Sequence, residues 1–201
     1  MKKKVIGITG GVGSGKSEVL NILKEDYGAG LIEADRVAHE LMEPGAVCYE
    51  AVVKQFGKKI LTDKGEIDRA ALGAVVFQDE DKLRLLNSLT HPQVVKEIMR
   101  RMDVMEKDPK IGLIVYEAAL LTGAEFEQRF DQLWYVFARE DLRFQRLKEG
   151  RGYSDEKTAS MIKSQPGEES FRNAATHIID NSGSLDETRR QIAGILGLKS
   201  L

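Results

Sequence analysis

The sequence has a single cysteine, Cys48, among its 201 residues. One cysteine cannot form a disulfide within the chain, and this usage fits a reducing compartment such as the cytosol. An excess of charge of one sign is also missing, because 30 lysines and arginines stand against 32 aspartates and glutamates, a formal net charge of -2. We therefore expect no broad basic surface and no nucleic-acid partner, whereas a local anion site is compatible with this balance.

Long apolar runs are missing too. No stretch approaches the roughly 18 residues that a membrane-spanning helix needs. Three lysines at positions 2–4 precede an apolar segment, as in a secretion signal, but that segment is short, glycine-rich and ended by Lys16. The composition, 42% hydrophobic and 31% charged, is that of an ordinary globular protein. We expect a cytoplasmic protein without a membrane partner, and the oligomeric state stays open.

The beginning of the chain alternates between strand and helix patterns. Residues 5–9, Val-Ile-Gly-Ile-Thr, form an apolar run that indicates a strand buried on both faces. A glycine-rich turn follows, and from Ser17 apolar residues recur at helical spacing until Gly28. Further strands are expected at residues 31–32, 111–116, 133–138 and 177–180. Strands separated by helices predict an α/β fold, a parallel sheet flanked by helices.

Two segments depart from this alternation. Residues 35 to about 107 show helical patterns and hardly any strand, and a Thr90/Gln93 capping box predicts a new helix there. This length exceeds one crossover connection, so we expect an inserted helical region. Residues 139–165 are polar and helical in pattern, with glycines at 150 and 152 that interrupt them, which indicates a mobile flap. The basic residues of this flap are Arg139, Arg143, Arg146, Lys148 and Arg151.

The glycine-rich turn matches a phosphate-binding motif. Residues 10–17, Gly-Gly-Val-Gly-Ser-Gly-Lys-Ser, fit G-x-x-x-x-G-K-[ST] between a predicted buried strand and a predicted helix. Glycines let successive N–H groups face one anion, and the helix N-terminus adds free N–H groups and its positive dipole end. A turn that merely links strand to helix is the alternative, and the context favours nucleotide binding.

Each polar residue of the motif has an expected role. Lys16, on a loop expected to face solvent, would span the β- and γ-phosphates of ATP, and Ser17 would offer a hydroxyl to Mg²⁺. The expected ATP-binding residues are Gly11, Gly13, Ser14, Gly15, Lys16, Ser17 and Glu18.

A phosphate loop alone does not name the reaction. A GTPase would need both D-x-x-G and N-K-x-D; residues 180–183 fit the first motif close to the C-terminus, and the sequence lacks the second. A motor ATPase would need a clear apolar strand ending in Asp, whereas the nearest run ends in Glu117. A small-molecule kinase needs an acceptor-binding insertion, a basic lid and a carboxylate near the acceptor hydroxyl. The sequence has a candidate for each of the three.

The candidate carboxylate is Asp35, which follows the short second strand. It would emerge at the carboxyl end of the sheet, where open α/β folds hold ligands, and act as general base toward the acceptor hydroxyl. The alternative is that Asp35 caps the next helix, 36–42. His91 would contact an acceptor phosphate, or it would be an ordinary residue at a helix start.

Seven segments, the phosphate loop included, point to one family. They are residues 8–17, 34–41, 89–92, 117–121, 145–147, 164–165 and 179–183. In this order, with Ala-Asp-x-x-Ala-His, Thr-His-Pro and Ile-Asp-Asn-x-Gly as the specific parts, they resemble dephospho-coenzyme A kinase over nearly the whole chain. The resemblance implies ATP-dependent phosphorylation of the ribose 3′-hydroxyl of dephospho-CoA, with Asp35 near that hydroxyl and Arg146 in the catalytic set.

The same resemblance implies a P-loop NTPase-type domain in three parts. The core takes about 1–34, 108–138 and 166–201, the acceptor-binding helical region about 35–107, and the lid about 139–165. Four places depart from the family pattern: Glu33, residues 117–121, Gly150 with Arg151, and Thr176. Two alternatives stay open, a kinase of another nucleoside, nucleotide or small metabolite and a non-catalytic ATP-binding regulatory protein.

Overall fold

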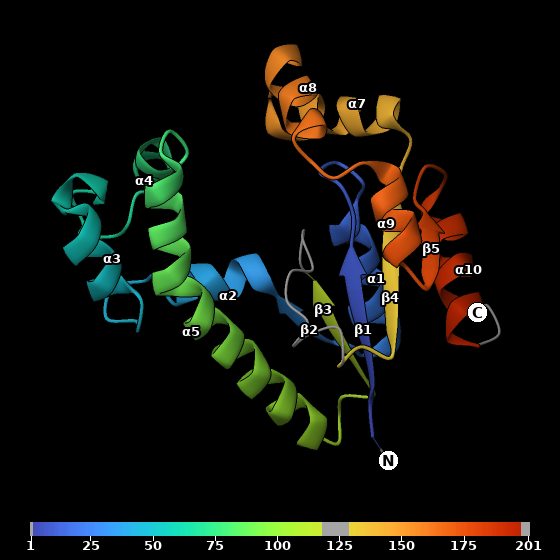
Figure 1. Cartoon of the computed structure of the whole chain (residues 1–201). Coiled ribbons are helices and arrows are strands. Elements are labelled where there is room, and N and C mark those ends of the chain that lie inside the picture. Colours follow the sequence, from blue (N-terminus) through green and yellow to red (C-terminus); the bar gives the residue numbers. More distant parts are fainter. Residues whose placement is uncertain (1, 118–128, 198–201) are drawn as a thin grey trace. The chain divides into compact units, whose positions relative to one another are not determined.

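The computed structural model describes residues 2–117 and 129–197, and the side chain of Arg151 is outside this description (Figure 1). The chain divides into two compact units. Unit 1 comprises Met1–Leu31 and Met105–Leu201, and unit 2 comprises Ile32–Val104. In the described residues, no helix is both long and apolar enough to cross a membrane.

The fold contains a five-stranded sheet, of which four strands lie entirely in unit 1 and the fifth, β2, begins there (Figure 1). Its strands are β1 (Lys4–Thr9), β2 (Gly30–Glu33), β3 (Leu113–Glu117), β4 (Gln132–Phe137) and β5 (His177–Asp180). They lie in the order β2-β3-β1-β4-β5, and β1 runs parallel to both β3 and β4. The predicted α/β fold class is thereby confirmed, because every strand expected from the sequence is present.

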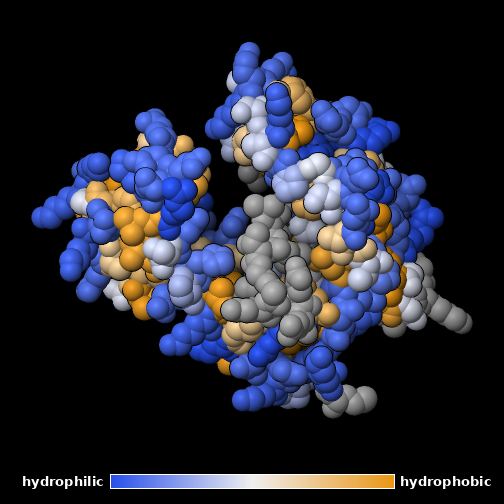
Figure 2. Space-filling view, viewed as in Figure 1, coloured by the Kyte–Doolittle hydropathy of each residue, from blue (hydrophilic) through white to orange (hydrophobic). Residues whose placement is uncertain are grey.

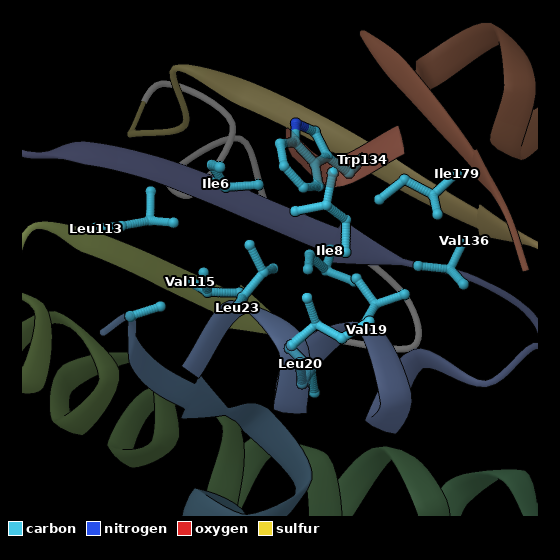
Figure 3. Packing of buried hydrophobic residues seen from close by; sticks show 13 residues of the cluster. Ile6, Ile8, Val19, Leu20, Leu23, Leu113, Val115, Trp134, Val136 and Ile179 are labelled. Carbon is cyan, nitrogen blue, oxygen red and sulfur yellow. The ribbon is translucent and has the colours of Figure 1, made fainter. Parts of the chain in front are cut away.

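The core of unit 1 lies between this sheet and two helices. Apolar side chains of β1, β3, β4 and β5 meet those of α1 (Lys16–Tyr27) and α10 (Leu185–Leu196) (Figure 3). Trp134 and Val136 of β4 point into this cluster, so Tyr135 between them points to the opposite face. There its ring stacks on Phe171 of α9 (Glu168–Ala174), with 5.1 Å between ring centroids. Helices therefore cover both faces of the sheet.

The predicted flap contains two helices, α7 (Glu140–Arg151) and α8 (Asp155–Lys163). Helix α7 continues through Gly150, where the sequence predicted an interruption. It ends at Gly152, whose φ of 64° is left-handed and whose N–H donates to the Lys148 carbonyl. Gly150 is tolerated within the helix because a glycine only weakens a helix interior and does not break its hydrogen bonding.

Unit 2 is helical, as the sequence predicted for this region. It contains α2 (Ala34–Glu40), α3 (Tyr49–Phe56), a 3₁₀ turn (Lys58–Ile60), α4 (Arg69–Val76) and most of α5 (Glu80–Lys107). Its buried cluster consists of Val52, Phe56, Ile60, Leu72 and Val76.

The helix start predicted at Thr90 is wrong. Helix α5 runs unbroken from Glu80 to Lys107 with Pro92 inside it, and its first N–H groups are capped by Asp79, whose Oδ1 accepts from Asp81 and Lys82. Thr90 instead donates its hydroxyl to the Leu86 carbonyl one turn earlier. Pro92 removes one helical hydrogen bond, and the bend of α5 in Figure 1 is the usual consequence.

The face of unit 2 seen in Figure 2 carries hydrophobic side chains among hydrophilic ones. The most exposed large hydrophobic residues of this unit are Val47, Phe77 and Val104. Single exposed apolar side chains are normal on protein surfaces, so we assign them no function.

Ion pairs join α2 to α5 within unit 2. Arg101 of α5 pairs with Glu40 at the end of α2 and with Glu97, and Arg100 pairs with the other oxygen of Glu97. Hydrogen bonds from these two arginines lower the pKa of Glu97 to about 2 from an ordinary value of 4.5.

This depressed pKa predicts an acid-sensitive contribution to stability. Because the folded-state pKa lies below the unfolded one, the contribution is complete above about pH 4.5 and is lost as the pH falls toward 2. We expect Glu97→Gln to lower the melting temperature at pH 7 by roughly 2–4 °C and to flatten its fall between these pH values. Thermal scans from pH 7 to 2 check this, with the exposed Glu106→Gln as control. Parallel curves for wild type and Glu97→Gln would contradict it.

Candidate active site

The phosphate loop, residues 10–17, connects β1 to α1. Gly10, Gly13 and Gly15 have φ angles of 156°, 77° and 84°, where residues with side chains are strained. A Cβ atom at Gly15 would also collide with the side-chain amide of Asn181. The conformation of the loop therefore requires the two glycines that the motif fixes, at 10 and 15.

The loop leads into a helix N-terminus suited to an anion. Gly15 occupies the N-cap position of α1, and among the described residues no side chain caps the helix. The Ser14 side chain is 1% exposed, and in the part of the chain that the structure describes its hydroxyl has no hydrogen-bond partner. A buried hydroxyl without a partner beside uncapped helix N–H groups fits a bound phosphate.

Lys16 is more buried than the sequence predicted. Its side chain is 16% exposed, where a solvent-facing residue was expected. The ammonium group donates to the Gly10 carbonyl at 2.8 Å and lies 3.7 Å from the Glu117 carboxylate. Strand register explains the pair, because Glu117 ends β3 opposite Ile8 of β1, just before the loop. The positive charge is thus held at the carboxyl end of the sheet, where α/β folds bind ligands.

Arg146 of α7 lies against the phosphate loop. Its guanidinium donates to the carbonyls of Ser14, at 3.3 Å, and Asn181, at 3.0 Å. The Asn181 amide donates to the same Ser14 carbonyl at 3.0 Å, and Thr188 donates to the Asn181 amide oxygen at 2.9 Å. Arg146 is therefore fixed beside the loop through backbone oxygens, and Asn181, to which the sequence analysis gave no role of its own, supports the same turn.

Two cavities open beside these residues. The first, of about 430 Å³, is lined by Gly15, Ser17, Glu18, Arg146, Asn181, Gly183 and Leu185. The second, of about 560 Å³, is lined by Arg139, Asp180, Ser182, Gly183, Glu187, Arg190 and Gln191. Because both include Gly183, they form neighbouring spaces along the loop that follows β5, next to the start of α1.

The second group of predicted site residues lies in unit 2. Asp35 is exposed and stands in the first turn of α2, whose N-cap residue is Glu33. Asp35 is thus not the cap of this helix, which was the alternative to a catalytic role. A carboxylate in the first turn still interacts favourably with the helix dipole.

His39 follows Asp35 by one helical turn. Burial and the nearby positive charge of Arg69 lower the pKa of His39, whereas Asp35 acts to raise it. Arg69, the first residue of α4, is a cation that the sequence analysis missed because nothing local marks it. His91 lies on an exposed part of α5. Asp35, His39 and Arg69 therefore share one electrostatic neighbourhood within unit 2.

Other predicted features are structural or lie outside the described residues. The Thr176 hydroxyl bonds both the N–H and the carbonyl of Leu133, at 3.0 and 2.9 Å, and so joins the starts of β4 and β5. Residues 118–121 and the Arg151 side chain lie outside the description. In residues 2–117 and 129–197, no three His, Cys, Asp or Glu side chains group as a metal site.

Solved structures share this fold. The crystal structure of TT1252 from Thermus thermophilus superposes with a TM-score of 0.83, at 29% identity over 98% of each chain. Dephospho-CoA kinase from Campylobacter jejuni has a TM-score of 0.70 at 24% identity, covering 97% of this chain and 96% of that one. A shikimate kinase from Acinetobacter baumannii, at 17% identity and a TM-score of 0.54 over 97% and 94%, shares the fold alone.

Sequence relatives are closer. Dephospho-CoA kinase from Carboxydothermus hydrogenoformans is 42% identical over 192 residues, which is 96% of this chain and 92% of the relative. The enzyme of that name from Moorella thermoacetica is 38% identical over 189 residues, covering 94% and 88%. The family model described as dephospho-CoA kinase matches residues 4–187. Because this match includes the phosphate loop, Asp35, Arg146 and Asn181, the chain belongs to the dephospho-CoA kinase family.

Proposed function

We propose that the protein transfers the γ-phosphate of ATP to the ribose 3′-hydroxyl of dephospho-CoA, giving coenzyme A and ADP in the last step of coenzyme A biosynthesis. The observation that carries the proposal is the family match over residues 4–187 of a chain whose phosphate loop has the geometry of an anion site. The cytoplasmic location expected from the sequence belongs to the same proposal.

The phosphate loop and its neighbours would bind the nucleotide. Backbone N–H groups of residues 13–17 and the N-terminus of α1 would hold the β- and γ-phosphates. Lys16 would exchange its Gly10 contact for phosphate oxygens, and Arg146 would neutralise charge that develops during transfer. The two cavities along the loop after β5 would take the ribose and adenine.

Magnesium fits the donors at the start of α1. Mg²⁺ prefers oxygen ligands and keeps several waters, so the Ser17 hydroxyl and phosphate oxygens suffice to hold it. Bound there, it would supply positive charge that offsets the negative charge of the phosphates. Ser17 is exposed at the first turn of α1, so the approach of such an ion is open.

Asp35 would be the general base for the acceptor. The 3′-oxygen forms a bond to the γ-phosphorus, its proton passes to the Asp35 carboxylate, and the bond from phosphorus to the leaving oxygen of ADP breaks. The exposure of Asp35 supports the proposal, since a carboxylate that receives a substrate proton needs access to substrate. Arg69 and His39 beside it would complement an acceptor phosphate.

An acceptor comparison tests the proposed function. ADP release by the purified protein would be measured with MgATP and, in turn, dephospho-CoA, AMP and shikimate. We expect kcat/KM for dephospho-CoA to exceed the other two by at least about 100-fold. Preference for another acceptor would show a different kinase, and ATP binding without turnover for any acceptor would show a regulatory protein.

A further inference from the structure

Two residues of the lid segment 139–165 form hydrogen bonds with Val12 of the phosphate loop. The Val12 N–H donates to the side-chain oxygen of Gln165 at 2.8 Å, and the Val12 carbonyl accepts from Arg143 Nε at 2.9 Å. Arg143 Nη2 also donates to the same Gln165 oxygen at 3.0 Å. Val12, Arg143 and Gln165 thus form a closed ring of three hydrogen bonds, and all three residues are half-buried.

The glycines of the loop fit this ring. A Cβ atom at Gly11 would collide with the Arg143 guanidinium and lie 3.0 Å from the Gln165 oxygen. Gly11 has no left-handed φ that would demand glycine, so the approach of these two side chains explains the residue. At Gly13 a Cβ atom would lie 2.8 Å from the backbone oxygen of Arg143. The loop is thus shaped to receive helix α7 as well as an anion.

The ring acts on the glycine-rich part of the loop. Four of the six residues from Gly10 to Gly15 are glycines, which lose the most conformational freedom when they become ordered. Bonds to both the N–H and the carbonyl of Val12 fix two consecutive peptide planes between Gly11 and Gly13. A loop ordered before the nucleotide arrives binds it more tightly, because less ordering remains to be done on binding.

Arg143 and Arg146 contact different parts of the phosphate loop, so we expect them to have different roles. Both are lid arginines, but two donors of Arg143 are taken up by the Val12 carbonyl and the Gln165 side chain. We propose that Arg143 and Gln165 are positioning residues, which hold the loop in its nucleotide-binding conformation through the Val12 peptide groups without touching phosphate. This inference rests on the proposed function in one respect only, namely that the loop binds ATP.

The test uses two variants that remove the ring from opposite sides. Gln165→Met keeps the length of the side chain, Arg143→Met keeps its unbranched apolar stem, and both lose the hydrogen bonds. We expect each to raise the Kd of both MgATP and MgADP by about tenfold, measured by calorimetry without acceptor. The double variant should bind nucleotide as tightly as either single variant. Each single substitution already opens the ring, so the second should cause no further loss of affinity. The KM for dephospho-CoA should stay unchanged.

A second readout needs neither nucleotide nor activity. In the ligand-free protein, the Val12 amide should exchange its hydrogen slowly in the wild type and faster in both variants, by at least about tenfold. Gly11→Ala supplies an independent variant, since its methyl group would displace the Arg143 guanidinium although no lid residue is substituted. It should reproduce both effects. Gln145→Met on α7 and Arg84→Met on α5, both exposed, are the matched controls and should change neither.

Three results would overturn the proposal. The first is faster Val12 exchange with unchanged nucleotide affinity, which would make the ring merely structural. The second is an Arg143→Met effect on ATP far larger than on ADP and not shared by Gln165→Met, which would make Arg143 a γ-phosphate ligand. The third is a double variant whose loss equals the product of the single losses. A wrong acceptor would affect none of these measurements, so failure of the proposed function is distinguishable.

Discussion

Replacing Lys16 by alanine should lower kcat by about 10²–10³-fold or more. The ammonium group is held at the carboxyl end of the sheet by the Gly10 carbonyl and the Glu117 carboxylate, so it is already positioned for phosphate. Its contribution grows as negative charge shifts during transfer, and alanine supplies none of it. The measurement is kcat with saturating MgATP and dephospho-CoA.

The Glu117 contact adds a stability effect that must be separated from catalysis. The Glu117 side chain is 13% exposed, and in Lys16→Ala its carboxylate loses the Lys16 ammonium group as a partner. Because loss of a partner from a largely buried charge is destabilising, we expect the melting temperature to fall by roughly 2–4 °C. The double variant Lys16→Ala with Glu117→Gln should recover the melting temperature and keep the lowered kcat. Recovery of activity in the double variant, or undiminished kcat in the single one, would contradict the role of Lys16.

Asp35→Asn should lower kcat at least about 100-fold with little change in ATP affinity. Asparagine keeps the size and hydrogen-bonding reach of the side chain but removes the proton acceptor and one negative charge. Because Glu33 is the N-cap of α2 and Asp35 is exposed, the substitution should leave the melting temperature near that of the wild type.

A magnesium series separates the remaining roles of Asp35. If the carboxylate bound the metal, raised Mg²⁺ would restore much of the lost rate, whereas a lost base is not restored. Asp63→Asn, on an exposed turn of the same unit, serves as control and should change nothing. Near-normal turnover of Asp35→Asn at ordinary Mg²⁺ would remove Asp35 from the catalytic residues.

Local patterns were sufficient for most of the fold. The strand at β1, the glycine turn and α1 follow from adjacent residues, and so does the end of α1 at Gly28, whose φ is 62°. Local patterns did not predict the start of helix α5 correctly. The Thr90/Gln93 pattern favours a helix start, yet the Asp79 cap and the apolar residues on both sides of Pro92, such as Leu86 and Met102, keep one helix.

The site was predictable where it is local and not where it is assembled from distant segments. The phosphate loop is contiguous, so its sequence identifies it. Glu117 reaches Lys16 only through the pairing of β1 with β3, and Arg143 and Gln165 reach Val12 from 131 and 153 residues away. No spacing rule links such residues. The resemblance to the family predicted a role for Arg146, and the structure adds that its guanidinium donates a hydrogen bond to the Ser14 carbonyl.

The central claim is that the 3′-hydroxyl of dephospho-CoA receives the phosphate, and one measurement tests it most directly. ADP release from MgATP by the wild-type protein would be followed with dephospho-CoA and, in parallel, with coenzyme A, whose 3′-oxygen already carries phosphate. We predict one ADP released per dephospho-CoA added, with a product that co-elutes with coenzyme A, and no release above the acceptor-free background with coenzyme A itself. Equal ADP release with the two compounds, or a product phosphorylated elsewhere, would contradict the account.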